Sequence, residues 1–117
     1  MNVKIAAYVG FAIKKGKVIF GAERLVGGAR VHPKVTLVAE NTGRSTFNSV
    51  ARFCASCGVP LYVVKGDNLF DYAKKDVKVL TVADKGLGAA IIKEIEENSP
   101  EEFNIYTEVQ PIDNENE

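Results

Sequence analysis

Tryptophan is absent from this sequence of 117 residues, and methionine and histidine occur once each. Cysteine occurs only at Cys54 and Cys57, too few for the disulfide framework of a small secreted domain. No apolar run approaches the roughly 18 residues that a membrane-spanning helix requires, and we expect no signal peptide at the start of the chain. These absences argue against secreted and membrane proteins, so we expect a cytoplasmic location and no membrane partner.

The composition that remains is typical of a globular domain. Hydrophobic residues make up 46% of the chain and charged residues 26%, which argues against collagenous and wholly disordered proteins. The length suits one domain rather than two. We expect this domain to span residues 1–97, followed by an acidic, partly disordered C-terminal extension over residues 98–117.

Basic residues are missing from the end of the chain. All fifteen lie at or before Lys93, together with only six acids, so that part carries a formal charge of +9. The other nine acids lie from Glu94 to Glu117 and give that part −9. This polarity suggests a polyanionic partner and an internal competitor for it. The other interpretation is a solvated tail beside scattered surface lysines.

Hydrophobic periodicity predicts strands alternating with helices. We expect strands over 17–20, 35–39, 59–64 and 77–82, and helices over 1–15, 21–26, 45–57, 67–73 and 84–97, with Asp67 and Asp84 as N-caps and Gly58 as a C-cap. This alternation predicts a three-layer α/β/α sandwich around a four-stranded sheet. The expected core comprises Ile5, Val9, Ile13, Leu25, Leu37, Val38, Val50, Cys54, Val63, Leu80, Val82, Leu87 and Ile91.

Motifs for catalysis or cofactor binding are weak. Cys54 and Cys57 have the spacing of a redox or zinc pair, but they fall on the apolar stripe of a helix and are better explained as core residues. The segment Gly86-Leu-Gly88 lacks the third glycine of a dinucleotide-binding loop. The lone His32 offers no nucleophile–base arrangement. We therefore expect no enzyme, no metal and no cofactor.

Three segments in order carry a specific similarity: Leu-Val-Ala-Glu at 37–40, the stretch from Cys54 to Pro60, and Val-Lys-Val-Leu-Thr-Val-Ala-Asp-Lys-Gly at 77–86. They resemble the kink-turn RNA-binding ribosomal protein family known as L-seven-Ae/L-thirty-e. The opening Gly-Phe-Ala-Ile-Lys-Lys-Gly-Lys-Val-Ile-Phe-Gly at 10–21 resembles its bacterial YlxQ-type branch. The resemblance covers about residues 8–97 and implies an L-thirty-e-like sandwich with a mixed sheet.

The resemblance also implies an RNA site. The family's site is a glycine opening the second helix, then Asn-Glu, then a lysine one turn later, supported by a second loop before the last strand. Here Gly21 and Ala22 are followed by Glu23 in place of asparagine, Arg24 in place of glutamate and Gly27 in place of lysine. A carboxylate only accepts hydrogen bonds, whereas an asparagine amide also donates them. The remaining expected site residues are the nearby Arg30 and the second loop's Lys74, Lys75 and Lys78.

The resemblance thus implies non-catalytic binding of structured RNA, of kink-turn or internal-loop type, in a monomer associated with ribosomal or translation proteins. Backbone N–H groups at the helix starting from Gly21 would contact phosphate. The alternative is a protein-interaction module of the same fold that has lost RNA affinity. The apolar residues Phe103, Ile105, Tyr106 and Val109 in the acidic extension suggest docking on the body as an added strand.

Overall fold

A computed structural model describes residues 1–28 and 32–106 of the chain. In chain order its elements are α1 (Val3–Lys14), β1 (Val18–Phe20), α2 (Ala22–Val26), β2 (Val35–Ala39), α3 (Arg44–Cys57), β3 (Leu61–Val64), α4 (Phe70–Ala73), β4 (Val79–Val82), α5 (Lys85–Asn98) and β5 (Phe103–Ile105). The alternation of strands and helices follows the periodicity of the sequence.

The strands form one mixed sheet in the order β1-β4-β2-β3-β5. Only β2 and β3 run parallel, and the three other neighbouring pairs are antiparallel. The expected count of four strands is wrong, because Phe103–Ile105 pairs with β3 and adds a fifth. The sheet therefore extends past residue 97, and β1 and β5 form its two opposite edges.

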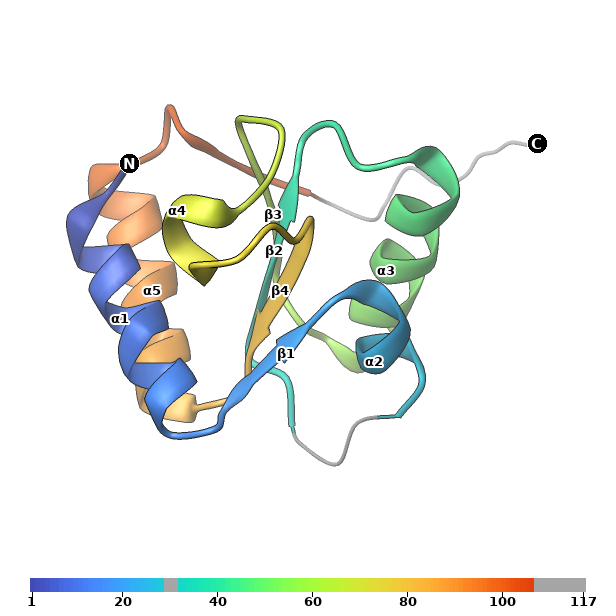
Figure 1. The fold of residues 1–117 in the computed structure, drawn as a ribbon, viewed down its shortest axis with the longest axis horizontal. Helices are drawn as coiled ribbons and strands as arrows, with labels where there is room; N and C mark the ends of the chain where they lie inside the picture. Colours follow the sequence, from blue (N-terminus) through green and yellow to red (C-terminus); the bar gives the residue numbers. More distant parts are fainter. Residues whose placement is uncertain (29–31, 107–117) are drawn as a thin grey trace.

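Helices cover both faces of this sheet, as the sequence predicts (Figure 1). One apolar cluster joins α1, α4 and α5 to the sheet through residues such as Ile5, Leu37 and Ile91. A second cluster joins α2 and α3 to the other face through residues such as Leu25, Val38 and Val50. Leu37 and Val38 are neighbours on β2 and point to opposite faces, as a strand buried on both sides requires.

Most of the expected core is buried, but Ile13, Val63 and Leu87 are only half-buried. Ile13 and Leu87 lie in terminal turns, near the end of α1 and the start of α5. Val63 points toward the face covered by α2 and α3, where α2 contributes only five residues. Cys57 is exposed while Cys54 is buried, so the expectation of two core cysteines holds for Cys54 alone. Burial raises the pKa of the Cys54 thiol, which makes it a poor nucleophile.

Two of the expected helix caps are present and one is not. The Asp84 side chain accepts a hydrogen bond from the backbone N–H of Leu87 at the start of α5. Gly58 ends α3 in the left-handed conformation, with φ of 70°. Asp67 is not an N-cap, because α4 begins only at Phe70. The loop before it is tied to the segment that precedes β4, where the N–H of Leu69 donates to the carbonyl of Val77.

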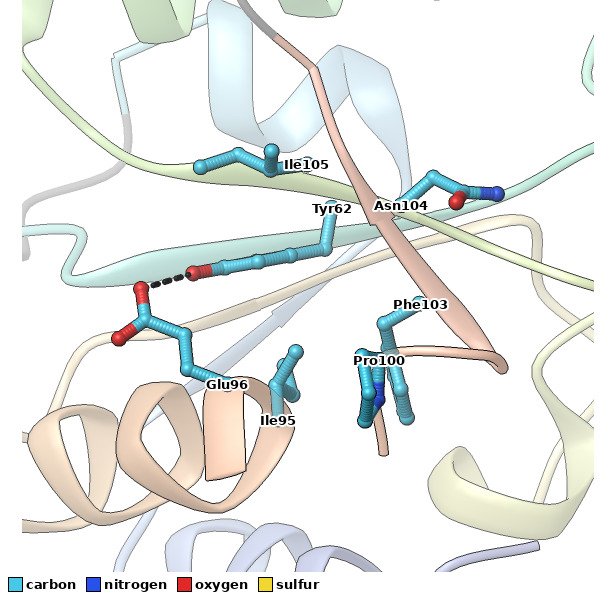
Figure 2. Close-up of a pocket in the computed structure, with 7 residues that line it drawn as sticks. All are labelled: Tyr62, Ile95, Glu96, Pro100, Phe103, Asn104 and Ile105. Atoms are coloured by element: carbon cyan, nitrogen blue, oxygen red, sulfur yellow. Dashed lines mark hydrogen bonds between the residues drawn. The ribbon is translucent and has the colours of Figure 1, made fainter. Parts of the chain in front are cut away.

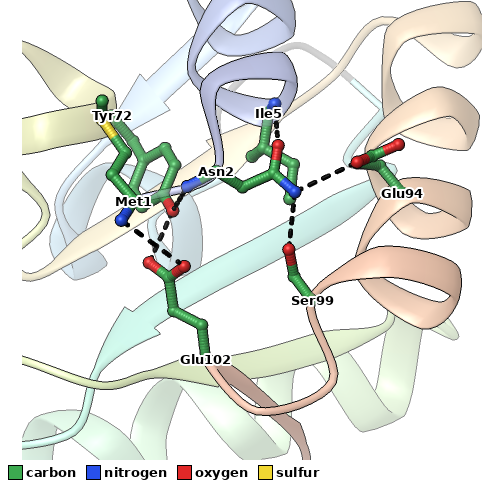
Figure 3. A network of polar contacts seen from close by, with 7 residues as sticks. All are labelled: Met1, Asn2, Ile5, Tyr72, Glu94, Ser99 and Glu102. Atoms are coloured by element: carbon green, nitrogen blue, oxygen red, sulfur yellow. Dashed lines mark hydrogen bonds and ion pairs between the residues drawn. The ribbon is translucent and has the colours of Figure 1, made fainter.

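The segment after α5 is tied to the N-terminus (Figure 3). The Asn2 side chain caps α1 through the N–H of Ile5 and donates to Glu94 and to Ser99. The hydroxyl of Tyr72 accepts from the backbone N–H of Asn2 and donates to Glu102, at 3.0 and 2.6 Å. These contacts join α1, α4, α5 and the start of β5, and they place residues 99–106 on the body of the domain.

Candidate nucleic-acid interface

The pairing of β1 with β4 brings the two expected RNA-contacting segments together (Figure 1). Phe20, the last residue of β1, lies opposite Leu80 of β4. The backbone N–H of Gly21 extends this ladder and donates to the carbonyl of Val79 at 2.8 Å. The start of α2 therefore lies directly beside the end of the loop over residues 74–78. Gly21 has φ of 90°, a conformation that side chains disfavour, so this junction requires glycine.

The same hydrogen bond removes one backbone donor from phosphate binding. Because the N–H of Gly21 is bonded to Val79, it cannot also be directed at a phosphate. The first N–H groups of a helix have no acceptor within it, so phosphate contact by the N–H groups of Ala22, Glu23 and Arg24 stays a prediction. The helix has only five residues, so its dipole adds little.

Residues of α2 divide between anchoring and exposure. Leu25 is buried in the cluster shared with α3, and Ala22 is half-buried. Glu23 and Arg24 are exposed. Arg24 therefore offers its charge to solvent three residues after the Gly21–Val79 bond, as the resemblance implies for a ligand contact.

Glu23 borders a shallow hollow between α2 and α3. Ala22, Val26 and Gly27 line it from α2, and Ser45, Thr46 and Ser49 line it from α3, around a volume of about 400 Å³. Sequence reasoning missed these hydroxyl residues. The spacing of Ser45 and Ser49, four residues apart on one helix face, is the signal that could have found them.

Gly27 ends α2 in a crowded position. A Cβ atom added there would lie 2.6 Å from the carbonyl oxygen of Glu23, too close for an unshifted backbone. The family's lysine at this point therefore cannot be restored without moving the end of α2. Arg30, the further expected cation, lies outside the described residues.

Two lysines of the second loop are exposed beside β1. Lys74 follows α4 with φ of 62°, a left-handed conformation that is unusual for a residue other than glycine. This turn is followed by Lys75, whose ammonium nitrogen lies 4.4 Å from the centre of the Phe20 ring. The cation–π contact holds the charge of Lys75 next to the start of α2.

Lys78 has a different role from its neighbours. Its ammonium group donates to the Asn41 side chain at 2.9 Å and to the carbonyl of Asp67 at 2.7 Å. These bonds join the loops that follow β2 and β3 to the start of β4. Two of the three ammonium donors are thereby engaged, so Lys78 positions the loop more than it presents a charge.

The cations of this surface form no ion pair among the described residues, although the exposed carboxylates Glu23, Asp71 and Asp76 lie in or next to the same two segments. The two ion pairs found within residues 1–28 and 32–106 join Lys15 to Asp84 and the N-terminal ammonium to Glu102. Neither involves Arg24, Lys74, Lys75 or Lys78. Asp71 and Asp76 are nearby in the chain, and the Lys74 ammonium lies 3.4 Å from the carbonyl oxygen of Asp71.

The described residues hold no group of three His, Cys, Asp or Glu side chains that could bind a metal, and no helix among them is long and apolar enough to cross a membrane.

Comparisons with known proteins support the fold. No protein-family model matches the sequence. No curated protein matches it either. The chain is similar to a solved structure of a protein with unknown function from Bacillus halodurans, with a TM-score of 0.69 and 22% identity, over 82% of this chain and 100% of that one. At this identity the likeness defines an α/β sandwich and leaves the ligand open.

Proposed function

We propose that this protein is a non-catalytic, cytoplasmic RNA-binding protein of the L-seven-Ae/L-thirty-e family, with kink-turn or internal-loop RNA as its ligand. The observation that carries the proposal is the bond from Gly21 to Val79. It joins the start of α2, which carries Arg24, to the end of the loop that carries Lys74 and Lys75, although the two segments are far apart in the sequence. The surface thereby gains three exposed cations without an ion-pair partner among the described residues.

Such a surface suits a folded RNA better than a small molecule. The cations stand on two elements at the edge of the sheet, where a phosphate backbone can span them. Structured RNA is recognised largely through its shape and phosphates, so few base contacts are needed. Association with the ribosome or with translation proteins follows from the family resemblance.

Two observations favour the alternative, a protein-interaction module that has lost RNA affinity. Glu23 presents a carboxylate where RNA phosphates would approach, and the ammonium group of the exposed Lys78 is engaged by Asn41 and Asp67. In that case the hollow between α2 and α3 would contact a protein. The two candidates differ in their response to salt and to RNA shape.

The test is a titration of a fluorescent kink-turn RNA, a plain duplex and a single strand over a range of salt concentrations. RNA binding predicts tighter association with the kink-turn and a linear fall of log affinity with log salt. Replacing Lys74 and Lys75 by alanine should lower the magnitude of that slope by about two. Lys85→Ala is the matched control, since Lys85 is exposed and follows the opposite end of β4. Equal and weak binding of all three RNAs would favour the interaction module.

A further inference from the structure

The edge of the sheet formed by β5 has no partner strand among the described residues. On its inner side the N–H of Tyr106 donates to the carbonyl of Leu61, and the N–H of Lys65 donates to the carbonyl of Glu102. Hydrogen-bonded positions alternate along an antiparallel ladder. Ile105 pairs with Tyr62 at a position of the ladder that is not hydrogen-bonded. Its backbone N–H and C=O therefore point away from β3. An added strand could pair with these groups.

An apolar pocket lies next to this open edge (Figure 2). It encloses about 350 Å³ between β5 and α5, and Tyr62, Ile95 and Phe103, all buried, contribute to its lining. Ile105 also lines it and is 60% exposed. The Tyr62 hydroxyl donates to the Glu96 carboxylate at 3.2 Å, and burial together with Glu96 raises the pKa of Tyr62 to about 12. The pocket can accept one apolar side chain beside a fixed negative charge.

The surroundings of the pocket are acidic. Residues 94–106 include five glutamates and no lysine or arginine. Glu94 and Glu102 are bonded to Asn2 and Tyr72, on the side of the N-terminus. Glu96, Glu97 and Glu101 are exposed, and Glu96 lines the pocket. Glu101 lines a neighbouring hollow that it shares with Lys65, so Glu96 is the carboxylate that the pocket itself presents. A positively charged partner suits this edge best.

The opposite edge of the sheet differs in this respect. Lys17 directly precedes β1, and Lys75 lies over Phe20 at its end. Lysines on an edge strand discourage pairing with other chains. No charged residue occurs from Phe103 to Tyr106, so this edge lacks that protection.

We propose that the β5 edge binds an extended, basic segment of a partner protein by strand addition. One apolar side chain of the segment occupies the pocket between β5 and α5, and a lysine or arginine of the segment faces Glu96. Backbone pairing supplies affinity in this mode, and the pocket supplies specificity. A second copy of this chain suits the edge poorly, because the two acidic surroundings would repel each other. The inference does not depend on RNA binding.

The experiment measures the fluorescence anisotropy of a labelled peptide, Lys-Val-Lys-Ile-Arg-Val-Lys, with the full chain. A second peptide carries glutamate at every basic position. A third keeps the charges but has proline at the apolar positions, which removes backbone donors. We expect the first peptide to bind and the other two to bind at least about tenfold more weakly. The third peptide separates strand addition from attraction to the acidic end of the chain.

Variants of the protein locate the site. Ile105→Asp and Glu96→Lys should each weaken binding by about tenfold or more. Val3→Asp and Glu23→Lys are matched controls, because Val3 is 72% exposed on α1 and Glu23 lies on α2. Peptide binding should also slow hydrogen exchange at the Ile105 amide.

Three results would overturn the proposal: no binding of the basic peptide, equal binding of the acidic or the proline peptide, or no effect of either site variant. A concentration-dependent dimer that is lost in Ile105→Asp would assign the edge to a second copy instead. If Ile105→Asp fails to fold, Glu96→Lys decides alone.

Discussion

Glu23 and Gly27 determine how far the candidate interface departs from the family that it resembles. Glu23 is exposed and can only accept hydrogen bonds, while Gly27 is confined by the carbonyl of Glu23. The resemblance alone suggests replacing Glu23 by asparagine and Gly27 by lysine together, but the lysine would disturb the end of α2. The informative change is therefore Glu23 alone.

We expect Glu23→Asn to strengthen kink-turn RNA binding by about three- to tenfold. The change removes a negative charge facing phosphate and restores an amide that both donates and accepts. The measurement is RNA affinity at one fixed salt concentration, with Glu97→Asn on α5 as the control. If Glu23→Asn leaves affinity unchanged, the ligand does not contact α2.

The Asn2 side chain makes three hydrogen bonds near the N-terminus. It caps α1 and bonds to both Glu94 and Ser99. We expect Asn2→Ala to lower the free energy of unfolding by about 1–3 kcal/mol, measured by urea denaturation. Asn48→Ala, at an exposed position of α3, should change it little. A loss from Asn2→Ala no larger than that from Asn48→Ala would contradict the structural role given to this network.

Single residues also show where sequence reasoning ends. Asp84 and Gly58 were predictable as caps because local hydrogen bonds and backbone conformation decide them. The engagement of Lys78 by Asn41 and Asp67 was not, because three segments distant in sequence meet there. The exposure of Cys57 was missed because α3 ends at that residue, beyond the part that packs on the sheet.

Among the elements, α5 shows how acid should affect stability. The pKa of Asp84 lies below its ordinary value of 3.8, mainly because the backbone N–H of Leu87 donates to its carboxylate. The hydrogen bond from the Lys15 ammonium group is the next largest cause. The Asn2 amide holds the pKa of Glu94 below 4.5. Carboxyl groups whose pKa is lowered by folding stabilise the protein above their unfolded values and cease to do so as pH falls.

Asp84 and Glu94 are ionised above about pH 5, so we expect their contribution to the thermal midpoint to be constant there. The midpoint should fall as the pH drops through their lowered pKa values. Asp84→Asn and Glu94→Gln should make this decline shallower. Glu97→Gln, at an exposed position, is the control. The assignment fails if both variants follow the wild-type decline in parallel.

The sequence reasoning placed β5 in the C-terminal extension and left it out of the four expected strands. It also suggested that this segment docks as an added strand, and the pairing with β3 confirms this for Phe103 and Ile105. The strands β1 to β4 are mostly continuous apolar runs. In contrast, β5 has only three residues, Phe-Asn-Ile, and follows a polar stretch. Its position depends on Phe103 entering the core and on the ladder with β3. The apolar residues suggested docking, but tertiary contacts decide the pairing.

Truncation separates the two parts of the acidic end. Removing residues 99–117 deletes β5 and the buried Phe103, so we expect a loss of about 3 kcal/mol or more in unfolding free energy.

Removing residues 107–117 keeps β5 and deletes four acids. This shorter deletion should raise RNA affinity, more at low salt than at high salt, if the acids compete with phosphate. Unchanged affinity across the salt series would exclude that competition.

For the whole molecule, the sheet order separates two surfaces of opposite charge. The candidate RNA surface lies at the β1 edge, and the acidic pocket lies at the β5 edge. The charge polarity was visible in the sequence, and so were the two basic segments through the family resemblance. The strand order β1-β4-β2-β3-β5 could not be predicted from periodicity, because pairing between distant strands depends on contacts that local patterns do not encode.

The most direct test of RNA binding at the β1 edge is a map of backbone amide chemical shifts on addition of a kink-turn RNA to the full chain. We expect the largest changes from Gly21 to Arg24 and from Lys74 to Lys78, where the Gly21–Val79 bond joins the two segments. Residues Phe103–Ile105 at the opposite edge should remain unchanged. Changes concentrated at β5 or on the outer face of α1, or no changes at all, would contradict the account.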